Sequence, residues 1–200
     1  MVWSEELKRE IPKGWGVENL MSVCDWVSGA QPPKSTFKYR ETDGYIRFIQ
    51  NRDYADSNNL TFIPISKGNK VCDVFDIMMD KYGDAGQIRY GLEGAYNVAL
   101  AKVKPKASGI QEYLRGFLGS GSVKKYLFNA CMASTRASLN GEILGNLFVA
   151  IPDAELLSQY EKFSKTVIRQ LLGIKQESAK LAELRDWLLP ILMNGQIKVS

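Results

Sequence analysis

The sequence predicts a mixed α/β globular domain over residues 1–152, followed by a long coiled-coil helix over residues 153–200. Before residue 152, short apolar runs alternate with polar positions and are separated by Gly, Pro, Asn and Asp. From Glu155 to Leu189 there is no proline and only one glycine, and apolar residues recur at intervals of three and four. A chain of 200 residues with 45% hydrophobic content is large enough to bury a core.

The first domain is expected to be sheet-rich, with one or two helices. Period-two alternation predicts strands in GYIRFIQ (44–50), NLTFIPI (59–65), VCDVFDIMM (71–79) and YNVALAKV (96–103). A helical period predicts a helix in IQEYLRGFL (110–118). The run ILGNLFVAI (143–151) is interpreted as a buried strand, and Pro152 as the hinge into the long helix.

The long helix is expected to begin at the Asp153 cap and to stop at Pro190, before Asn194-Gly195. About 35 residues at about 1.5 Å per residue give a rod of about 50 Å, too long to lie wholly on a domain of this size. One apolar stripe follows it and is expected to pair with another helix. The alternative is a core helix packed back on the first domain. The stripe consists of Tyr160, Phe163, Val167, Leu171, Ile174, Leu181, Leu184 and Leu188.

Composition excludes several kinds of chemistry. The chain has no histidine, which removes Ser-His and Cys-His nucleophiles. The segment FLGSGSVKK (117–125) resembles a phosphate-binding loop, but its spacing is neither GxxxxGK(S/T) nor GxGxxG. Cys24, Cys72 and Cys131 form no CxxC pair, so we expect three buried thiols in a reducing compartment and neither a metal site nor a cofactor. No apolar run is long enough to span a bilayer, which predicts a cytoplasmic protein without a membrane partner.

Two alternative functions remain open. Asp73, Asp76 and Asp80 have a spacing that could hold a magnesium ion in a nuclease, although the surrounding alternation favours a buried strand with solvated acids. The chain could also be a structural oligomerisation module whose first domain binds protein.

Four motifs in order resemble the DNA specificity subunit of type I restriction-modification enzymes, and together they cover nearly the whole chain. They are IPKGWGVENLMSVCDWVSGAQPP (11–33), DIMMDKYGDAGQIRYGLEGAYNVALAKVKP (76–105), STRASLNGEILGNLFVAIP (134–152) and LAELRDWLLPILMNGQIKV (181–199). They are similar to the entry, the middle and the close of a target recognition domain and to the end of the conserved spacer helix.

This resemblance implies a non-catalytic, half-length subunit that reads one half of a split DNA target. Its partners would be double-stranded DNA, methyltransferase subunits and, through them, restriction subunits. Family members usually carry two recognition domains and two antiparallel spacer helices. The stripe would therefore pair either with a second copy in an antiparallel homodimer or with the other half of a longer specificity chain; WSEELKREIPKGW (3–15) resembles the junction before a second recognition domain.

No catalytic residue is assigned, and the predicted DNA contacts lie in polar loops. Arginine reads guanine, Asn and Gln read adenine, and Lys and hydroxyl groups hold phosphates. A further basic segment lies between Ala99 and Gly141, with seven Lys or Arg residues against the single acid Glu112. The expected DNA-binding residues are Lys34, Lys38, Arg40, Gln50, Asn51, Arg52, Tyr54, Arg89, Tyr90, Ser134, Arg136 and Asn140.

Overall fold

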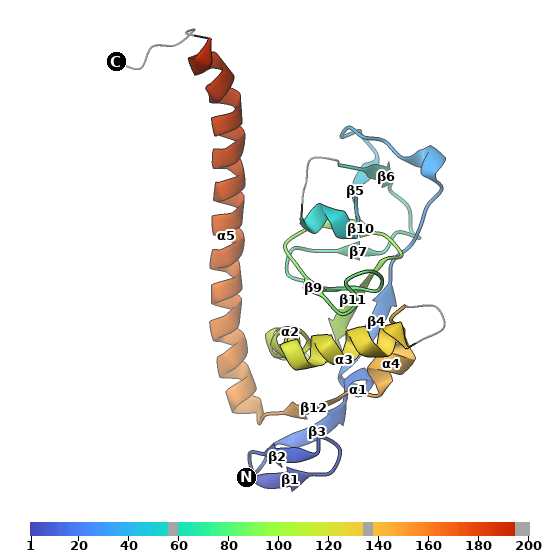
Figure 1. The fold of residues 1–200 in the computed structure, drawn as a ribbon, viewed down its shortest axis with the longest axis vertical. Coiled ribbons are helices and arrows are strands. Elements are labelled where there is room, and N and C mark those ends of the chain that lie inside the picture. Colours follow the sequence, from blue (N-terminus) through green and yellow to red (C-terminus); the bar gives the residue numbers. More distant parts are fainter. Residues whose placement is uncertain (56–59, 134–137, 195–200) are drawn as a thin grey trace. The chain divides into compact units, whose positions relative to one another are not determined.

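The computed structural model describes residues 1–55, 60–133 and 138–194 (Figure 1). The chain divides into two compact units, Met1–Glu161 and Lys162–Ser200. The mixed α/β domain and the long C-terminal helix expected from the sequence are both confirmed. We refer to Met1–Glu161 as the head.

Short strands and helices alternate along the head. Its strands are β1 (Val2–Ser4), β2 (Arg9–Ile11), β3 (Gly16–Asn19), β4 (Cys24–Ser28), β5 (Tyr45–Ile49), β6 (Phe62–Pro64), β7 (Val71–Cys72), β8 (Ile77–Asp80), β9 (Ile88–Arg89), β10 (Gly94–Tyr96), β11 (Leu100–Pro105) and β12 (Phe148–Ile151). Its helices are α1 (Leu20–Val23), α2 (Gln111–Leu118), α3 (Gly121–Met132), α4 (Gly141–Gly145) and two 3-10 turns, η1 (Lys34–Thr36) and η2 (Asn51–Tyr54). The long helix is α5 (Ala154–Met193).

The strands form two larger sheets and two pairs. The larger sheets have the orders β6-β5-β10-β7 and β4-β11-β8-β9, and the pairs are β1-β2 and β12-β3. Every strand contact is antiparallel except that of β10 with β5. Figure 1 shows β5 and β6 at the opposite end of the head from β1 and β2.

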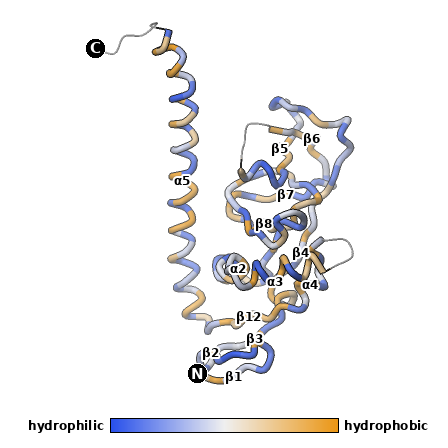
Figure 2. Tube along the Cα trace, in the orientation of Figure 1, coloured by the Kyte–Doolittle hydropathy of each residue, from blue (hydrophilic) through white to orange (hydrophobic). Residues whose placement is uncertain are grey.

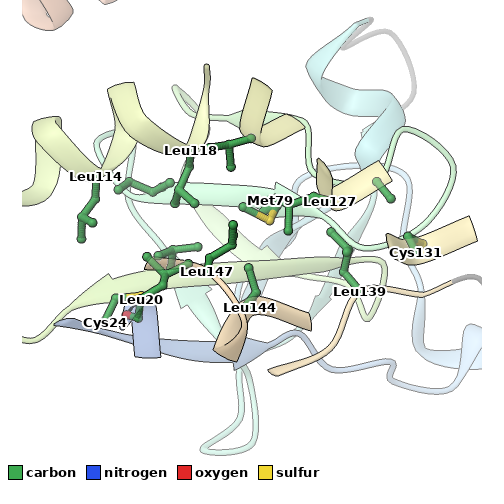
Figure 3. Close-up of a cluster of buried hydrophobic side chains, with 14 of the residues drawn as sticks. Leu20, Cys24, Met79, Leu114, Leu118, Leu127, Cys131, Leu139, Leu144 and Leu147 are labelled. Carbon is green, nitrogen blue, oxygen red and sulfur yellow. Dashed lines mark hydrogen bonds between the residues drawn. The ribbon is translucent and has the colours of Figure 1, made fainter. Parts of the chain in front are cut away.

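The main core lies between the β4-β11-β8-β9 sheet and helices α2, α3 and α4 (Figure 3). Leu114 and Leu118 of α2, Leu127 of α3 and Leu144 of α4 are buried beside Met79 of β8. Burial of such apolar side chains is the main stabilising contribution to a domain of this size. Cys24, Cys72 and Cys131 are all buried, as expected.

Several predicted elements are confirmed and others are wrong. Segment 44–50 forms β5 and 110–118 forms α2. Segment 71–79 is not one strand, because Asp73 accepts hydrogen bonds from the backbone N–H groups of Phe75 and Asp76 and turns the chain between β7 and β8. Segment 143–151 begins inside α4 rather than in a strand, since the Asn140 side chain caps that helix.

Two strands that are far apart in the sequence, β3 and β12, lie side by side. Strand β12 pairs with β3 in a register that sets Ile151 opposite Gly16 and Phe148 opposite Asn19. The Leu20 backbone N–H donates to Leu147 O at 2.8 Å, and Asn19 Nδ2 donates to Gly145 O at 2.5 Å. The part of the head between β3 and β12 therefore begins and ends at one place.

Helix α5 begins as predicted but does not stop where predicted. Asp153 Oδ1 accepts a hydrogen bond from the Leu156 backbone N–H at 2.9 Å, which caps the start. Pro190 lies inside the helix, which continues to Met193. A proline removes one intrahelical hydrogen bond. The helix resumes after it, since the Asn194 backbone N–H donates to Pro190 O at 3.0 Å. Figure 2 shows apolar and polar residues alternating along α5.

Among the described residues, no helix combines the length and apolar character that crossing a membrane requires.

Candidate nucleic-acid interface

The clearest cationic surface follows the segment that joins β4 to β5. Lys34 lies in η1 after two prolines, and Lys38, Arg40 and Lys34 are all exposed. The backbone of Lys38 exchanges hydrogen bonds with Phe62, 2.9 and 2.8 Å long, so the segment is fastened beside β6. The Lys38 ammonium lies 4.3 Å from the centroid of the Tyr45 ring. Backbone pairing and the cation–π contact hold this cation in place while leaving it accessible.

The η2 turn presents one more exposed cation. Gln50 and Asp53 form a capping box, in which the Gln50 backbone N–H donates to Asp53 Oδ2 at 2.9 Å. The Arg52 side chain is 59% exposed, and its Nε lies 3.7 Å from Asp53 Oδ1. Burial raises the pKa of the Asp53 carboxyl, and the hydrogen bond from Gln50 opposes that rise. The turn is therefore built around Asp53, with Arg52 projecting from it.

Other predicted contacts in this region face inward. Gln50 Nε2 lies 3.4 Å from Thr61 Oγ1, and Asn51 Oδ1 is buried without a hydrogen-bond partner among the described residues. The Tyr54 ring packs against the cluster of Ile49, Cys72, Met78, Tyr96 and Leu100, and burial raises the pKa of its phenol. Reading a base with Asn51 or Tyr54 would require these groups to turn outward.

Arg89 and Tyr90 form part of the fold's interior polar contacts. Arg89 donates through Nε at 3.2 Å and Nη2 at 2.9 Å to Asp80 Oδ2, and the Asp80 side chain is only 2% exposed. The Arg115 guanidinium carbon lies 4.7 Å from the centroid of the Tyr90 ring. Arg115 itself is paired with the buried Glu112 at 2.7 Å. Both side chains therefore contribute to holding the fold, and their contact with DNA stays a prediction.

The remaining predicted DNA contacts come after helix α3 in the sequence. Asn140 is exposed, and its side chain accepts a hydrogen bond from the Ile143 backbone N–H at 3.0 Å as the cap of α4. Ser134 and Arg136 lie outside the described residues. Much of the basic segment between Ala99 and Gly141 is occupied by ion pairs, namely Lys102 with Asp76, Lys106 with Asp25, Arg115 with Glu112 and Lys124 with Asp84.

Arg47 is a candidate that the sequence interpretation missed. It lies on β5, and its Nε and Nη2 are buried without a hydrogen-bond partner among the described residues. Its charge acts to lower the pKa values of Asp53 and Tyr54, so it belongs beside the η2 turn. The sequence feature that indicates Arg47 is its position as the single charged residue inside the largely apolar strand GYIRFIQ.

The three carboxylates of the nuclease alternative are engaged in holding the fold. Asp73 accepts backbone hydrogen bonds within its turn, and Asp76 Oδ2 accepts from the Asp73 backbone N–H at 2.9 Å and from Lys102 Nζ at 3.0 Å. Asp80 is paired with Arg89. Within residues 1–55, 60–133 and 138–194, no group of three or more His, Cys, Asp or Glu side chains could hold a metal ion. The nuclease alternative therefore finds no support in this geometry.

The predicted stripe on α5 is solvent-facing in the single chain. Seven of its eight side chains are exposed, from 36% for Val167 to 70% for Phe163, and Leu188 is partly exposed. Leu156, Trp187, Leu189, Leu192 and Met193 add further exposed apolar surface. A soluble chain seldom presents so long an apolar row unless another surface covers it.

The fold class is a mixed α/β domain with exposed loop cations, followed by one long helix that carries an exposed apolar stripe. No protein-family model matches the chain. Among curated proteins, it is 25% identical over 200 residues to the Type I restriction enzyme HindI specificity subunit of Haemophilus influenzae, covering 94% of this chain and 42% of that protein. It is 21% identical over 212 residues to the MjaIX specificity subunit of Methanocaldococcus jannaschii, covering 100% of this chain and 48% of that protein.

Solved structures give the same result for the fold. The HsdS subunit from Thermoanaerobacter tengcongensis matches with a TM-score of 0.59 at 21% identity, over 94% of this chain and 47% of that one. A chain from a study of complex assembly and conformational transition in the type I restriction-modification system matches with a TM-score of 0.60 at 23% identity, over 92% and 46%. The S subunit from M. genitalium matches with a TM-score of 0.60 at 16% identity, over 88% and 45%.

The expected resemblance is confirmed: along its length the chain is similar to one half of a type I restriction enzyme specificity subunit. It spans about half the length of the curated relatives that it matches.

Proposed function

We propose that this chain is a half-length DNA specificity subunit of a type I restriction-modification system. Residues 1–152 of the head read one half of a split target. Helix α5 pairs antiparallel with the helix of a second copy or of the other half of a longer specificity chain. The paired subunit holds methyltransferase subunits, and through them restriction subunits, on the site. It performs no chemistry itself and acts in the cytoplasm.

The observation that carries this proposal is the half-length match. Two curated specificity subunits match nearly all of this chain over less than half of their own length. This chain has one head and one α5, whose apolar stripe is exposed. A two-fold pair of such chains would restore two heads and two helices and would suit a DNA target made of two separated half-sites.

The exposed cations of the head support DNA as the ligand. Lys34, Lys38, Arg40 and Arg52 lie on loops that flank β5, and each projects into solvent. Such cations neutralise phosphates, and an arginine can also read guanine in the major groove. Arg47 on β5 is a further candidate for the same contacts, but its Nε and Nη2 atoms are buried.

Duplex DNA binding at several salt concentrations tests the head. Because phosphate neutralisation releases counterions, the affinity should fall steeply as salt rises. A head that binds only protein, as in the oligomerisation alternative, would show no such binding.

Co-expression with a methyltransferase subunit tests the assignment as a specificity subunit. Methylated adenines should appear in a split recognition sequence with a fixed gap between its halves. Methylation without any such sequence would contradict the proposal. Sedimentation of the isolated chain tests pairing separately, because a dimer should form whether or not DNA is present.

A further inference from the structure

A hollow in the head lies directly beside the start of α5. It has a volume of about 430 Å³, and its walls include Trp15, Tyr113 and Phe117 on one side and Leu156, Leu157 and Tyr160 on the other. The Tyr113 and Tyr160 rings meet edge to face at 6.1 Å and 83°. No lining residue carries a charge. Its chemistry suits apolar side chains rather than phosphate or a metal ion.

The hollow continues the apolar stripe of α5. Tyr160 is both the first residue of the stripe and part of the wall, and Leu156 extends the same row by one turn. Both side chains are more than 40% exposed in the single chain. An occupant of the stripe would therefore extend into the hollow.

The symmetry of an antiparallel pair identifies which residues would arrive there. The stripe from Tyr160 to Leu188 is centred on Ile174, so a residue a given number of positions before Ile174 lies opposite the residue the same number after it. On this register Tyr160 faces Leu188 of the other copy, and Leu156 faces Leu192. Leu192 is 40% exposed in the single chain.

Two pairs of opposite charges on α5 fit the same register. Lys162 is 12 positions before Ile174 and Asp186 is 12 after it, while Lys165 and Glu183 are each 9 positions away. An antiparallel pair therefore sets bases opposite acids, whereas a parallel pair in register would set Lys162 against Lys162. This complementarity favours a second copy as the occupant over an unrelated helix.

We propose that Leu188 and Leu192 at the far end of α5 in a second copy seat in this hollow, so that each head grips the end of the other copy's helix. The inference rests on the proposed antiparallel pairing and extends it. A helix pair alone would leave each head attached only through its own α5. The added contact would fix both ends of the pair and with them the separation of the two heads.

Disulfide trapping tests the contact directly. A chain carrying Leu156→Cys is mixed with a chain carrying Leu192→Cys, and the native cysteines do not interfere because all three are buried. The mixed disulfide should form in high yield, while Ser158→Cys, an exposed position on the same turn, should give little with Leu192→Cys. A Leu156→Cys homodisulfide would overturn the proposal, because it indicates parallel helices.

Filling the hollow gives a second readout. A Cβ added at Gly116, which lines the hollow, would meet only Tyr160 Oη, at 3.1 Å, so Gly116→Phe should fold and occupy the space. We expect about a tenfold rise in the dimer dissociation constant, and a similar rise for Leu192→Ala, with less than additive effects when both are combined. Additive effects, or an unchanged dimer, would overturn the contact.

Three outcomes separate this proposal from the function on which it rests. A dimer that shows no Leu156→Cys to Leu192→Cys disulfide overturns the contact and leaves the pairing intact. A chain that stays monomeric overturns both, while salt-sensitive DNA binding by the head would still stand. Loss of a co-purified methyltransferase subunit in Gly116→Phe, with the dimer unchanged, would assign the hollow to that partner instead and also overturn the proposal.

Discussion

Glu161 on α5 accepts a hydrogen bond through Oε2 from the backbone N–H of Glu112 in the first turn of α2, at 2.8 Å. Ile110, the residue before α2, offers no side-chain cap. A carboxylate from 49 positions further along the chain takes that place, and it is only 5% exposed. A negative group at a helix N-terminus satisfies an open N–H and complements the helix dipole. The start of α5 is thereby tied to the head.

Replacing Glu161 with alanine should destabilise the head by about 1 to 2 kcal/mol, because it leaves the Glu112 N–H without this acceptor in a buried place. Glu161→Gln keeps an oxygen acceptor and should recover part of the loss. Glu155→Ala, at an exposed position of the same helix, is the control. Urea denaturation measures all three, and equal losses for Glu161→Ala and Glu155→Ala would contradict the capping role.

Replacing Arg89 with alanine should cost about 3 to 5 kcal/mol at neutral pH, because it leaves the buried Asp80 carboxylate without its cation. Burial raises the pKa of Asp80 and Arg89 opposes that rise. A carboxyl whose folded pKa is raised contributes stability at low pH that is lost as pH rises. The deficit of Arg89→Ala should therefore shrink when denaturation is repeated near pH 5. A deficit independent of pH, or equal to that of the exposed Lys34→Ala, would contradict this account.

Arg52→Ala should weaken specific DNA binding by about 1 to 3 kcal/mol if Arg52 makes a bidentate base contact, and it should leave the unfolding free energy nearly unchanged. Asn140→Ala should lower the free energy of unfolding by about 1 kcal/mol, since it removes the cap of α4. Each variant is measured by both DNA titration and denaturation. Unchanged DNA affinity in Arg52→Ala would remove Arg52 from the interface.

The buried thiols should resist alkylation in the folded chain. Burial raises the pKa of Cys24 to about 11 and that of Cys72 to about 12. At pH 8.5 a thiol with a pKa of 11 is roughly 0.3% thiolate, and the thiolate is the reacting form. Mass spectrometry after iodoacetamide treatment should find both unmodified until denaturant is added. Because these pKa values are raised, alkaline pH should destabilise the fold. Rapid labelling of Cys24 in the native chain would show that its burial is incomplete.

The sequence correctly predicts elements whose apolar residues follow a single strand or helix periodicity without interruption. GYIRFIQ and IQEYLRGFL carry uninterrupted patterns, and each forms the element expected. Helix α4 was not predicted, because its five residues are too few to show a helical periodicity. Its start depends on a single capping side chain, that of Asn140. The end of α5 was placed too early because Pro190 removes one hydrogen bond without ending the helix.

The sequence predicts the residue types of the candidate DNA contacts but not the direction in which each side chain points. The exposed Lys34, Lys38, Arg40 and Arg52 remain predicted DNA contacts. Arg89 and Tyr54 were chosen for the same reason, yet both side chains point into the fold. Arg89 pairs with Asp80, and Tyr54 packs against the cluster that contains Cys72. Those neighbours come from other strands, so no local pattern could distinguish an inward arginine from an outward one.

The pairing of β3 with β12 has a consequence for replacing part of the head by a segment from another protein. Because Gly16 and Ile151 are opposite each other in one ladder, the segment between them begins and ends on two adjacent strands. A foreign segment with the same paired ends could be transplanted at these points without altering the strand ladder that joins them. Chimaeras cut inside the segment, in contrast, would separate strands such as β4 and β11 that complete each other's sheet.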